Sequence, residues 1–193
     1  KFCAARRKAL SPEVVHGQHD STGLLSDALT EVIHRIVTDQ NRLTKAFYST
    51  ALKSGISDGE YVETIGVIAT VIAIDGFTRA IGLPQFSLPD PESGEPSRHR
   101  PLGARIDRAW VPTVSPEDVT EAEASLYNGL AGANIHRALS LVPAETTGFF
   151  NLDAVQYLPD AQLRDYGTEY RDLTHVQIEL LAARVSALNQ CVY

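Results

Sequence analysis

A capping box opens the longest apolar segment of this chain and constrains its fold more than any other feature. Ser57 is followed three residues later by Glu60, a spacing in which each side chain satisfies a free backbone N–H of the other residue. The segment 59–81 is rich in valine and isoleucine, which a strand would also tolerate. The cap, the length and the closing Gly82-Leu83-Pro84 favour a helix. We therefore expect one long helix over 59–81.

Helical spacing recurs along the chain, and no alternating strand pattern of useful length appears. Apolar residues between Leu29 and Ile36 repeat every three or four positions, which is the period of an amphipathic helix. Thr174 and Gln177 form another capping box before the final helix. Further helices are predicted over 42–53, 120–130, 134–142 (ended by Pro143), 144–152 and 160–169. The sequence predicts an all-α protein.

The composition is typical of a globular protein and argues against two classes of partner. Of the 193 residues, 44% are hydrophobic and 21% are charged, as in ordinary soluble domains. No uninterrupted apolar run reaches the roughly 20 residues that span a bilayer, because Asp75 ends the longest one. The net charge of −7 and the lack of a basic run argue against nucleic acid. We expect a cytoplasmic protein without a membrane or nucleic-acid partner.

The cysteines and histidines predict neither a disulfide nor a metal site. Cys3 and Cys191 lie at opposite ends of the chain, and a reducing setting is the simpler interpretation. The six histidines show no His-x-x-x-His spacing, so we expect no metal and no cofactor. Because the sequence begins with lysine and contains no methionine, we expect it to be a piece of a longer protein.

A proline-rich stretch divides the chain. Seven of the ten prolines fall between positions 84 and 116, without any period, which is typical of a linker or an extended arm. Trp110, the only tryptophan, lies near its end, and we expect its large ring to pack on the rest of the protein. The predicted organisation is a helical unit over 1–85, an arm over 86–118 and a second helical unit over 119–193.

The two helical units contain a weak repeat. The segments from Glu31 to Leu43 and from Glu179 to Cys191 align without a gap, and a glutamate, a valine, a hydroxyl residue and an asparagine coincide. Leu43 stands where the second copy has Cys191. Chance can produce four such matches between two amphipathic helices. If the repeat is real, the first unit has lost its cysteine chemistry.

The last residues form the sharpest motif, in which Glu179 is followed by Val185-Ser186, Asn189 and Cys191. This motif resembles the segment of the AhpD-like, or carboxymuconolactone decarboxylase, superfamily that runs from a glutamate through Val-Ser-x-x-Asn-x-Cys-x-x-Cys to a histidine. Tyr193 stands between the cysteine positions, and the sequence ends there. The resemblance touches about 30–84 and 120–193. It implies an AhpD-like helical bundle of two related units and an antioxidant alkylhydroperoxidase activity, with a hydroperoxide as substrate and a thiol as reductant.

The resemblance implies catalytic roles for Cys191, Glu179 and His175. Cys191 is one half of a peroxidatic and resolving pair, and only its thiolate would attack a peroxide. Asn189 suits an N-cap, which would place Cys191 at the start of a following helix. Glu179 belongs to a proton relay. It precedes Cys191 by twelve residues, which span about 18 Å in a straight helix, so direct contact between the two would require the chain to turn back or another helix to mediate. His175, one turn before Glu179, substitutes for the family histidine. The alternatives are a buried structural cysteine, a solvated glutamate and a surface histidine.

Three functions are compatible with these features. The first is a thiol-dependent peroxidase, which requires a cysteine directly after Tyr193 in the longer protein. The second is a lyase similar to carboxymuconolactone decarboxylase, without disulfide chemistry. The third is a non-catalytic helical subunit that uses the first unit and the arm as an interface. We expect the first, in a homo-oligomer or a tight complex, because the second unit would otherwise expose apolar helix faces.

Overall fold

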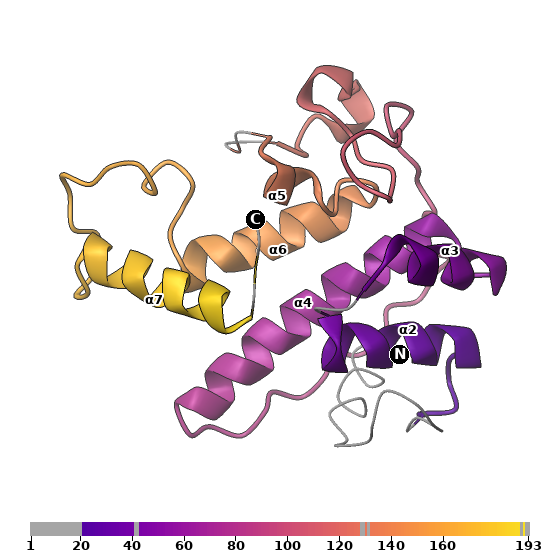
Figure 1. Ribbon diagram of the computed structural model, residues 1–193, viewed down its shortest axis with the longest axis horizontal. Helices are drawn as coiled ribbons and strands as arrows, with labels where there is room; N and C mark the ends of the chain where they lie inside the picture. Colours follow the sequence, from indigo (N-terminus) through magenta and orange to yellow (C-terminus); the bar gives the residue numbers. More distant parts are fainter. Residues whose placement is uncertain (1–20, 41–42, 128–129, 131, 190, 192–193) are drawn as a thin grey trace.

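A long helix, α4 (Asp58–Ala80), lies at the centre of the molecule (Figure 1). The structure is a computed structural model that describes residues 21–40, 43–127, 130, 132–189 and 191. Within these ranges there are six α-helices and no strand, which confirms the all-α class. The other helices are α2 (Asp27–Thr38), α3 (Lys45–Lys53), α5 (Asn134–Arg137), α6 (Pro143–Gln156) and α7 (His175–Leu188).

The capping box predicted at the start of α4 is present. The Ser57 hydroxyl accepts the Glu60 N–H at 3.1 Å, and the Glu60 carboxylate accepts the Ser57 N–H at 2.9 Å.

Helices α2 and α6 pack against different sides of α4 (Figure 1). By length and composition alone α4 could also cross a membrane, with a mean hydropathy of 1.4 over its most apolar window. Its packing between α2 and α6 accounts for the same apolar content.

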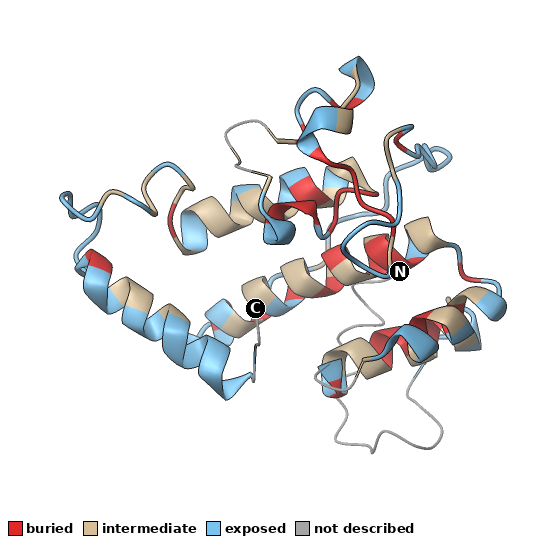
Figure 2. Ribbon diagram, turned by 45° about the horizontal axis from the view of Figure 1, so that its top comes forward, coloured by how far each residue is buried: buried red, intermediate tan, exposed pale blue. Residues whose placement is uncertain are grey.

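The core has two parts that meet along α4. In the larger part, Val32 and Ile33 of α2 pack with Tyr61 and Ile68 of α4, and each is nearly inaccessible to solvent. The smaller part joins Val62 of α4 to buried leucines around α5. Figure 2 shows the buried residues concentrated along α2, α4 and α5, whereas α7 is largely exposed.

The proline-rich arm has an exposed half and a packed half. Residues 81–100 are exposed apart from Leu88, whereas 112–115 are buried. Trp110 is only partly covered, since 44% of its surface is exposed. The neighbouring Val111 lies against both parts of the core.

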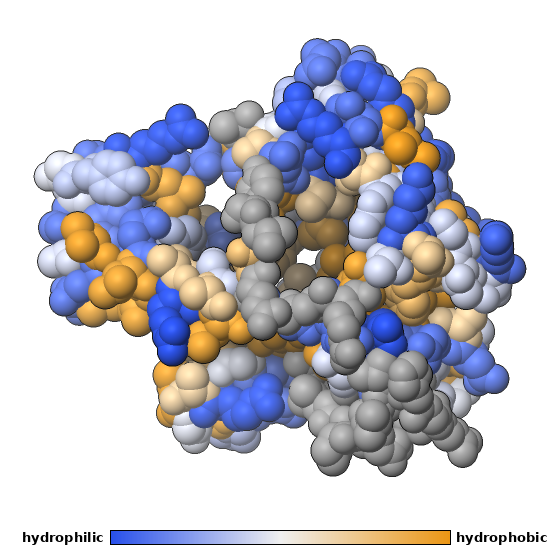
Figure 3. Space-filling view, in the orientation of Figure 1, coloured by the Kyte–Doolittle hydropathy of each residue, from blue (hydrophilic) through white to orange (hydrophobic). Residues whose placement is uncertain are grey.

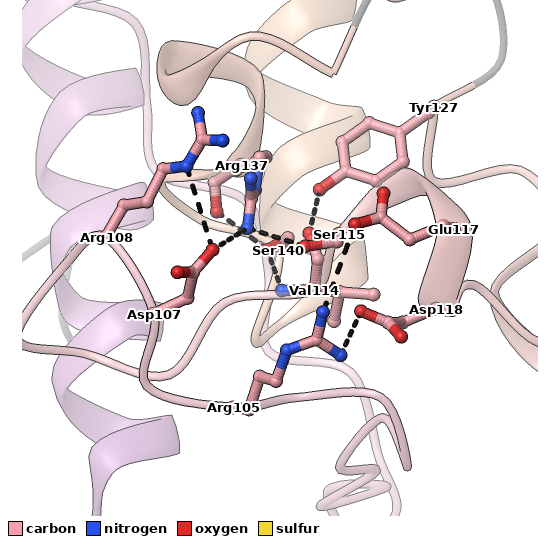
Figure 4. A network of polar contacts seen from close by, with 10 residues as sticks. All are labelled: Arg105, Asp107, Arg108, Val114, Ser115, Glu117, Asp118, Tyr127, Arg137 and Ser140. Atoms are coloured by element: carbon pink, nitrogen blue, oxygen red, sulfur yellow. Dashed lines mark hydrogen bonds and ion pairs between the residues drawn. The ribbon is translucent and has the colours of Figure 1, made fainter.

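A buried polar network fixes this packed half to the segment around α5 (Figure 4). The Arg137 guanidinium donates to the Ser115 hydroxyl at 2.7 Å and pairs with Asp107 at 3.2 Å. The Ser140 hydroxyl accepts the backbone N–H of Val114 at 2.8 Å. The hydrogen bonds satisfy polar groups that burial would otherwise leave without a partner. The arm is therefore ordered over this half by polar contacts as well as by packing.

Three predicted helices are absent or shorter than expected. The segment 120–130 has only a 3₁₀ turn, Glu121–Glu123, and further turns within its described residues. The helix expected over 134–142 stops at Arg137, and Pro143 begins α6 rather than ending a helix, because proline suits the first turn, where its missing N–H costs nothing. Residues 160–169 form turns. In each case an apolar pattern was too short to specify a helix.

Candidate functional site

Helix α7 begins as its sequence predicts and positions His175 and Glu179. The Thr174 hydroxyl accepts the Gln177 N–H at 3.3 Å, and the Gln177 side chain accepts the Thr174 N–H at 2.9 Å. This capping box fixes the first turn of the helix. His175 and Glu179 are four residues apart and lie on the same side of α7, where the His175 Nε2 is 3.5 Å from a Glu179 oxygen.

His175 is buried, which makes the surface-histidine interpretation wrong. Only 3% of its surface is exposed, and its ring stacks on Tyr166 with 4.6 Å between the ring centroids. Its backbone N–H donates to Glu169 at 2.5 Å, and its Nδ1 lies 3.3 Å from the backbone oxygen of Asp165. The loop that precedes α7 thus folds over the ring.

Glu179 has a second partner, Tyr157, which the sequence did not suggest. The Tyr157 hydroxyl, at the end of α6, donates to the Glu179 Oε1 at 2.5 Å. Burial, the hydrogen bond to Glu179 and the nearby negative charges raise the pKa of Tyr157 above its usual value. The Glu179 side chain is 39% exposed. The structure therefore forms a cluster of His175, Glu179 and Tyr157 in which Glu179 bridges the two other groups and reaches solvent.

Cys191 is a free, exposed thiol beyond the end of α7. Its backbone N–H donates to the Ser186 oxygen at 3.0 Å, so the chain turns back onto the last turn of the helix. Exposure makes the buried-cysteine alternative wrong. Asn189 is the C-cap of α7, and its side chain donates to the Val185 oxygen at 2.9 Å. The N-cap role expected of Asn189 is therefore replaced by a role in closing α7.

The structure does not bring Cys191 to the cluster of His175, Glu179 and Tyr157. Helix α7 is continuous from His175 to Leu188. The Cys191 N–H is bonded to the Ser186 oxygen, and the seven residues of helix from Glu179 to Ser186 span about 10 Å. Direct proton transfer between Glu179 and the thiol is excluded over this distance. Cys3 and Tyr193 lie outside the described residues.

The first copy of the repeat contains two residues with the spacing of a metal-ligand pair. Glu31 and His34 of α2 have Glu-x-x-His spacing, and His34 is buried. A group of three or more His, Cys, Asp or Glu side chains able to hold a metal does not occur in the part of the chain that the structure describes.

A second polar cluster lies in a cavity of about 380 Å³ beside α5 and α6. His136 lines this cavity together with Asp153 and Asp160. The His136 Nε2 is 3.6 Å from the Asp160 carboxylate. The three residues do not form a recognisable sequence motif. They come together only because α5 packs against α6 and against the loop that follows α6.

Comparison of this chain with models of known protein families, with curated proteins and with solved structures found no match.

Proposed function

We propose that this chain belongs to an AhpD-like, thiol-dependent oxidoreductase that reduces hydroperoxides in a reducing, cytoplasmic setting. Cys191 is the reactive thiol, and Glu179, Tyr157 and His175 are the proton-carrying groups. The observation that supports this function most directly is the hydrogen bond of Tyr157 to Glu179, with His175 beside it. It gives the glutamate that the family motif assigns to a relay two partners able to exchange a proton.

The proposed reaction consumes one hydroperoxide and two thiols. The Cys191 thiolate attacks the terminal peroxide oxygen; an S–O bond forms, the O–O bond breaks, and the departing alkoxide takes a proton and leaves as an alcohol. A second thiol then attacks the sulfenic acid on Cys191, which releases water and forms a disulfide. A further thiol reduces that disulfide and restores Cys191. Overall, the hydroperoxide becomes an alcohol and water, and two thiols become one disulfide.

The distance between Cys191 and the proton-carrying groups requires another copy or another segment to complete the site. Apolar side chains gather over α7 on the face shown in Figure 3. Leu180 and Leu188 are 69% and 63% exposed, and Val176, Leu181 and Val185 are also more than half exposed. Apolar groups of this extent favour association. In the proposed homo-oligomer, α7 packs against a neighbouring copy, whose relay then approaches the thiol.

The repeat supports the proposal that the protein has two related units. Helices α2 and α7 both begin at a hydroxyl N-cap, Ser26 and Thr174 respectively. In each helix the glutamate of the repeat, Glu31 or Glu179, is the fifth residue after that cap. The matching position of the N-cap extends the alignment of the two segments to residues that precede Glu31 and Glu179. The first unit, with Leu43 at the cysteine position, would then have a structural role.

The test is the consumption of tert-butyl hydroperoxide by the full chain with dithiothreitol as the reductant. We expect thiol-dependent turnover that Cys191→Ser abolishes and Cys3→Ser, the matched control, leaves intact. Glu179→Gln should lower the rate about 100-fold, because a positioned proton carrier contributes at least that much. Equal rates for Cys191→Ser and the unchanged chain would refute the proposal.

A non-catalytic helical subunit is the second candidate function, and the exposed apolar side chains of α7 favour it. The oligomeric state, measured by light scattering, tests this surface. Leu180→Gln should weaken the assembly, whereas Leu102→Gln, at a residue 91% exposed in the arm, should not. An assembly that forms through α7 but shows no hydroperoxide reduction would favour the second candidate over the first.

A further inference from the structure

The cavity beside α5 and α6 has an apolar wall and a polar end. Leu126, Phe150 and Leu158 belong to the wall, and Leu126 and Leu158 are each only 1% exposed. His136, Asp153 and Asp160 form the polar end. At about 380 Å³, the cavity has the size and the apolar character of a small-molecule site.

His136 is held firmly but has one nitrogen without a partner. The residue is 6% exposed, and its ring packs edge-on against Phe150 with 4.9 Å between the ring centroids. Nδ1 has no hydrogen-bond partner within the described residues. The negative charge of Asp160, 3.6 Å from Nε2, favours the tautomer with its proton on Nε2, so Nδ1 presents a lone pair. A buried nitrogen without a partner is costly and indicates a missing donor.

The polar end has more negative than positive charge. Burial and the charge of Asp160 raise the pKa of Asp153, and His136 acts in the opposite direction. These two are the charged groups found to act on Asp153. A protonated His136 would neutralise only one of the two carboxylates. A half-buried carboxylate whose charge is not fully compensated is unfavourable, so the cavity is suited to a cation.

We propose that this cavity binds a small organic cation, with its ammonium or amidinium group against His136, Asp153 and Asp160 and its apolar part against Phe150 and Leu158. The carboxylates and the His136 Nδ1 are all acceptors, and a protonated amine or amidine is a donor at every polar hydrogen. An anion would meet two carboxylates and is disfavoured. This site is separate from Cys191 and does not depend on the function proposed for that thiol.

The test is a titration of the full chain with three probes of similar shape and different charge, followed by NMR of the His136 ring. Benzylammonium and benzamidinium should shift the His136 resonances at millimolar concentrations. Benzyl alcohol should bind more weakly, and benzoate should not bind. Cys191→Ser should leave these results unchanged.

Two variants with the same change of charge make the test specific. Asp153→Asn should weaken benzylammonium binding about tenfold, equivalent to about 1.4 kcal/mol, and leave benzyl alcohol binding unchanged. Asp90→Asn, at an exposed position of the arm, should affect neither. Asp160→Asn provides a second variant if Asp153→Asn fails to fold. Failure of both cations to shift His136, binding of benzoate as tight as that of benzylammonium, or equal effects of Asp153→Asn and Asp90→Asn would overturn the proposal.

Discussion

The crossing of α4 and α6 depends on the absence of a side chain at Gly66. We therefore predict that replacement by alanine changes the stability of the protein in opposite directions at Gly66 and at Gly76, another glycine of α4. A Cβ at Gly66 would lie 2.8 Å from the Cβ and 2.9 Å from the Cγ of Glu145. The Glu145 Cβ is attached to the backbone of α6, so it moves only if that helix moves. A Cβ at Gly76, in the same helix, would meet nothing within 4 Å.

The magnitudes follow from two competing effects. Replacing glycine by alanine inside a helix stabilises a protein by about 1 kcal/mol, because alanine loses less backbone entropy on folding. Overpacking at a close helix contact costs about 1–3 kcal/mol. We therefore expect Gly66→Ala to lower the free energy of unfolding by up to about 2 kcal/mol, and Gly76→Ala to raise it by about 0.5–1 kcal/mol.

Urea unfolding followed by far-UV circular dichroism measures both changes, and an unchanged m-value shows that the unfolded state is not affected. The difference between the two variants is more informative than either value, since both carry the same gain in helix propensity. If Gly66→Ala proves as stable as Gly76→Ala, the close approach of α4 and α6 is refuted, and with it the packing of the first predicted unit on the second.

The other predictions concern a buried hydrogen bond, a titrating carboxyl and the core. Ser140→Ala removes the acceptor of the buried Val114 N–H and should cost about 1–3 kcal/mol in urea unfolding; a loss below about 0.5 kcal/mol, the usual scatter for surface changes, would contradict the network. Burial and the charge of Glu63 raise the pKa of Glu145 from 4.5 to about 7, so its stabilisation is complete below about pH 4.5 and is lost as the pH rises through 7. Glu145→Gln should flatten this dependence by less than about 3 kcal/mol, because solvent screens the charge of this partly exposed carboxyl. A stability–pH profile that the substitution leaves unchanged would count against the raised pKa. Ile33→Ala, at a residue 1% exposed, should cost about 2–5 kcal/mol by thermal or urea unfolding; a cost similar to that of an exposed Leu102→Ala would rule out the assigned core.

Much of the helical structure was predictable because local chemistry specifies it. The capping boxes at Ser57 and Thr174 are formed by residues three positions apart, so the sequence alone shows where α4 and α7 begin. Long apolar segments also gave the right class. The short segments failed, because the turns over 120–130 and 160–169 depend on contacts made elsewhere in the chain. Pro143 illustrates this limit: the same residue can follow one helix or begin the next.

In the candidate sites, too, the sequence specifies the local arrangement of residues and the tertiary structure specifies the rest. The sequence by itself determined that Glu179 and His175 share one side of a helix, because four residues of helix make a little more than one turn. Only the tertiary structure decided that His175 is buried under Tyr166 and that Tyr157 reaches Glu179. It alone gathered His136, Asp153 and Asp160 around one cavity. The physical reason is range: caps and helix periodicity act over a few residues, whereas burial, desolvation and charge pairing depend on segments that meet only when the helices pack.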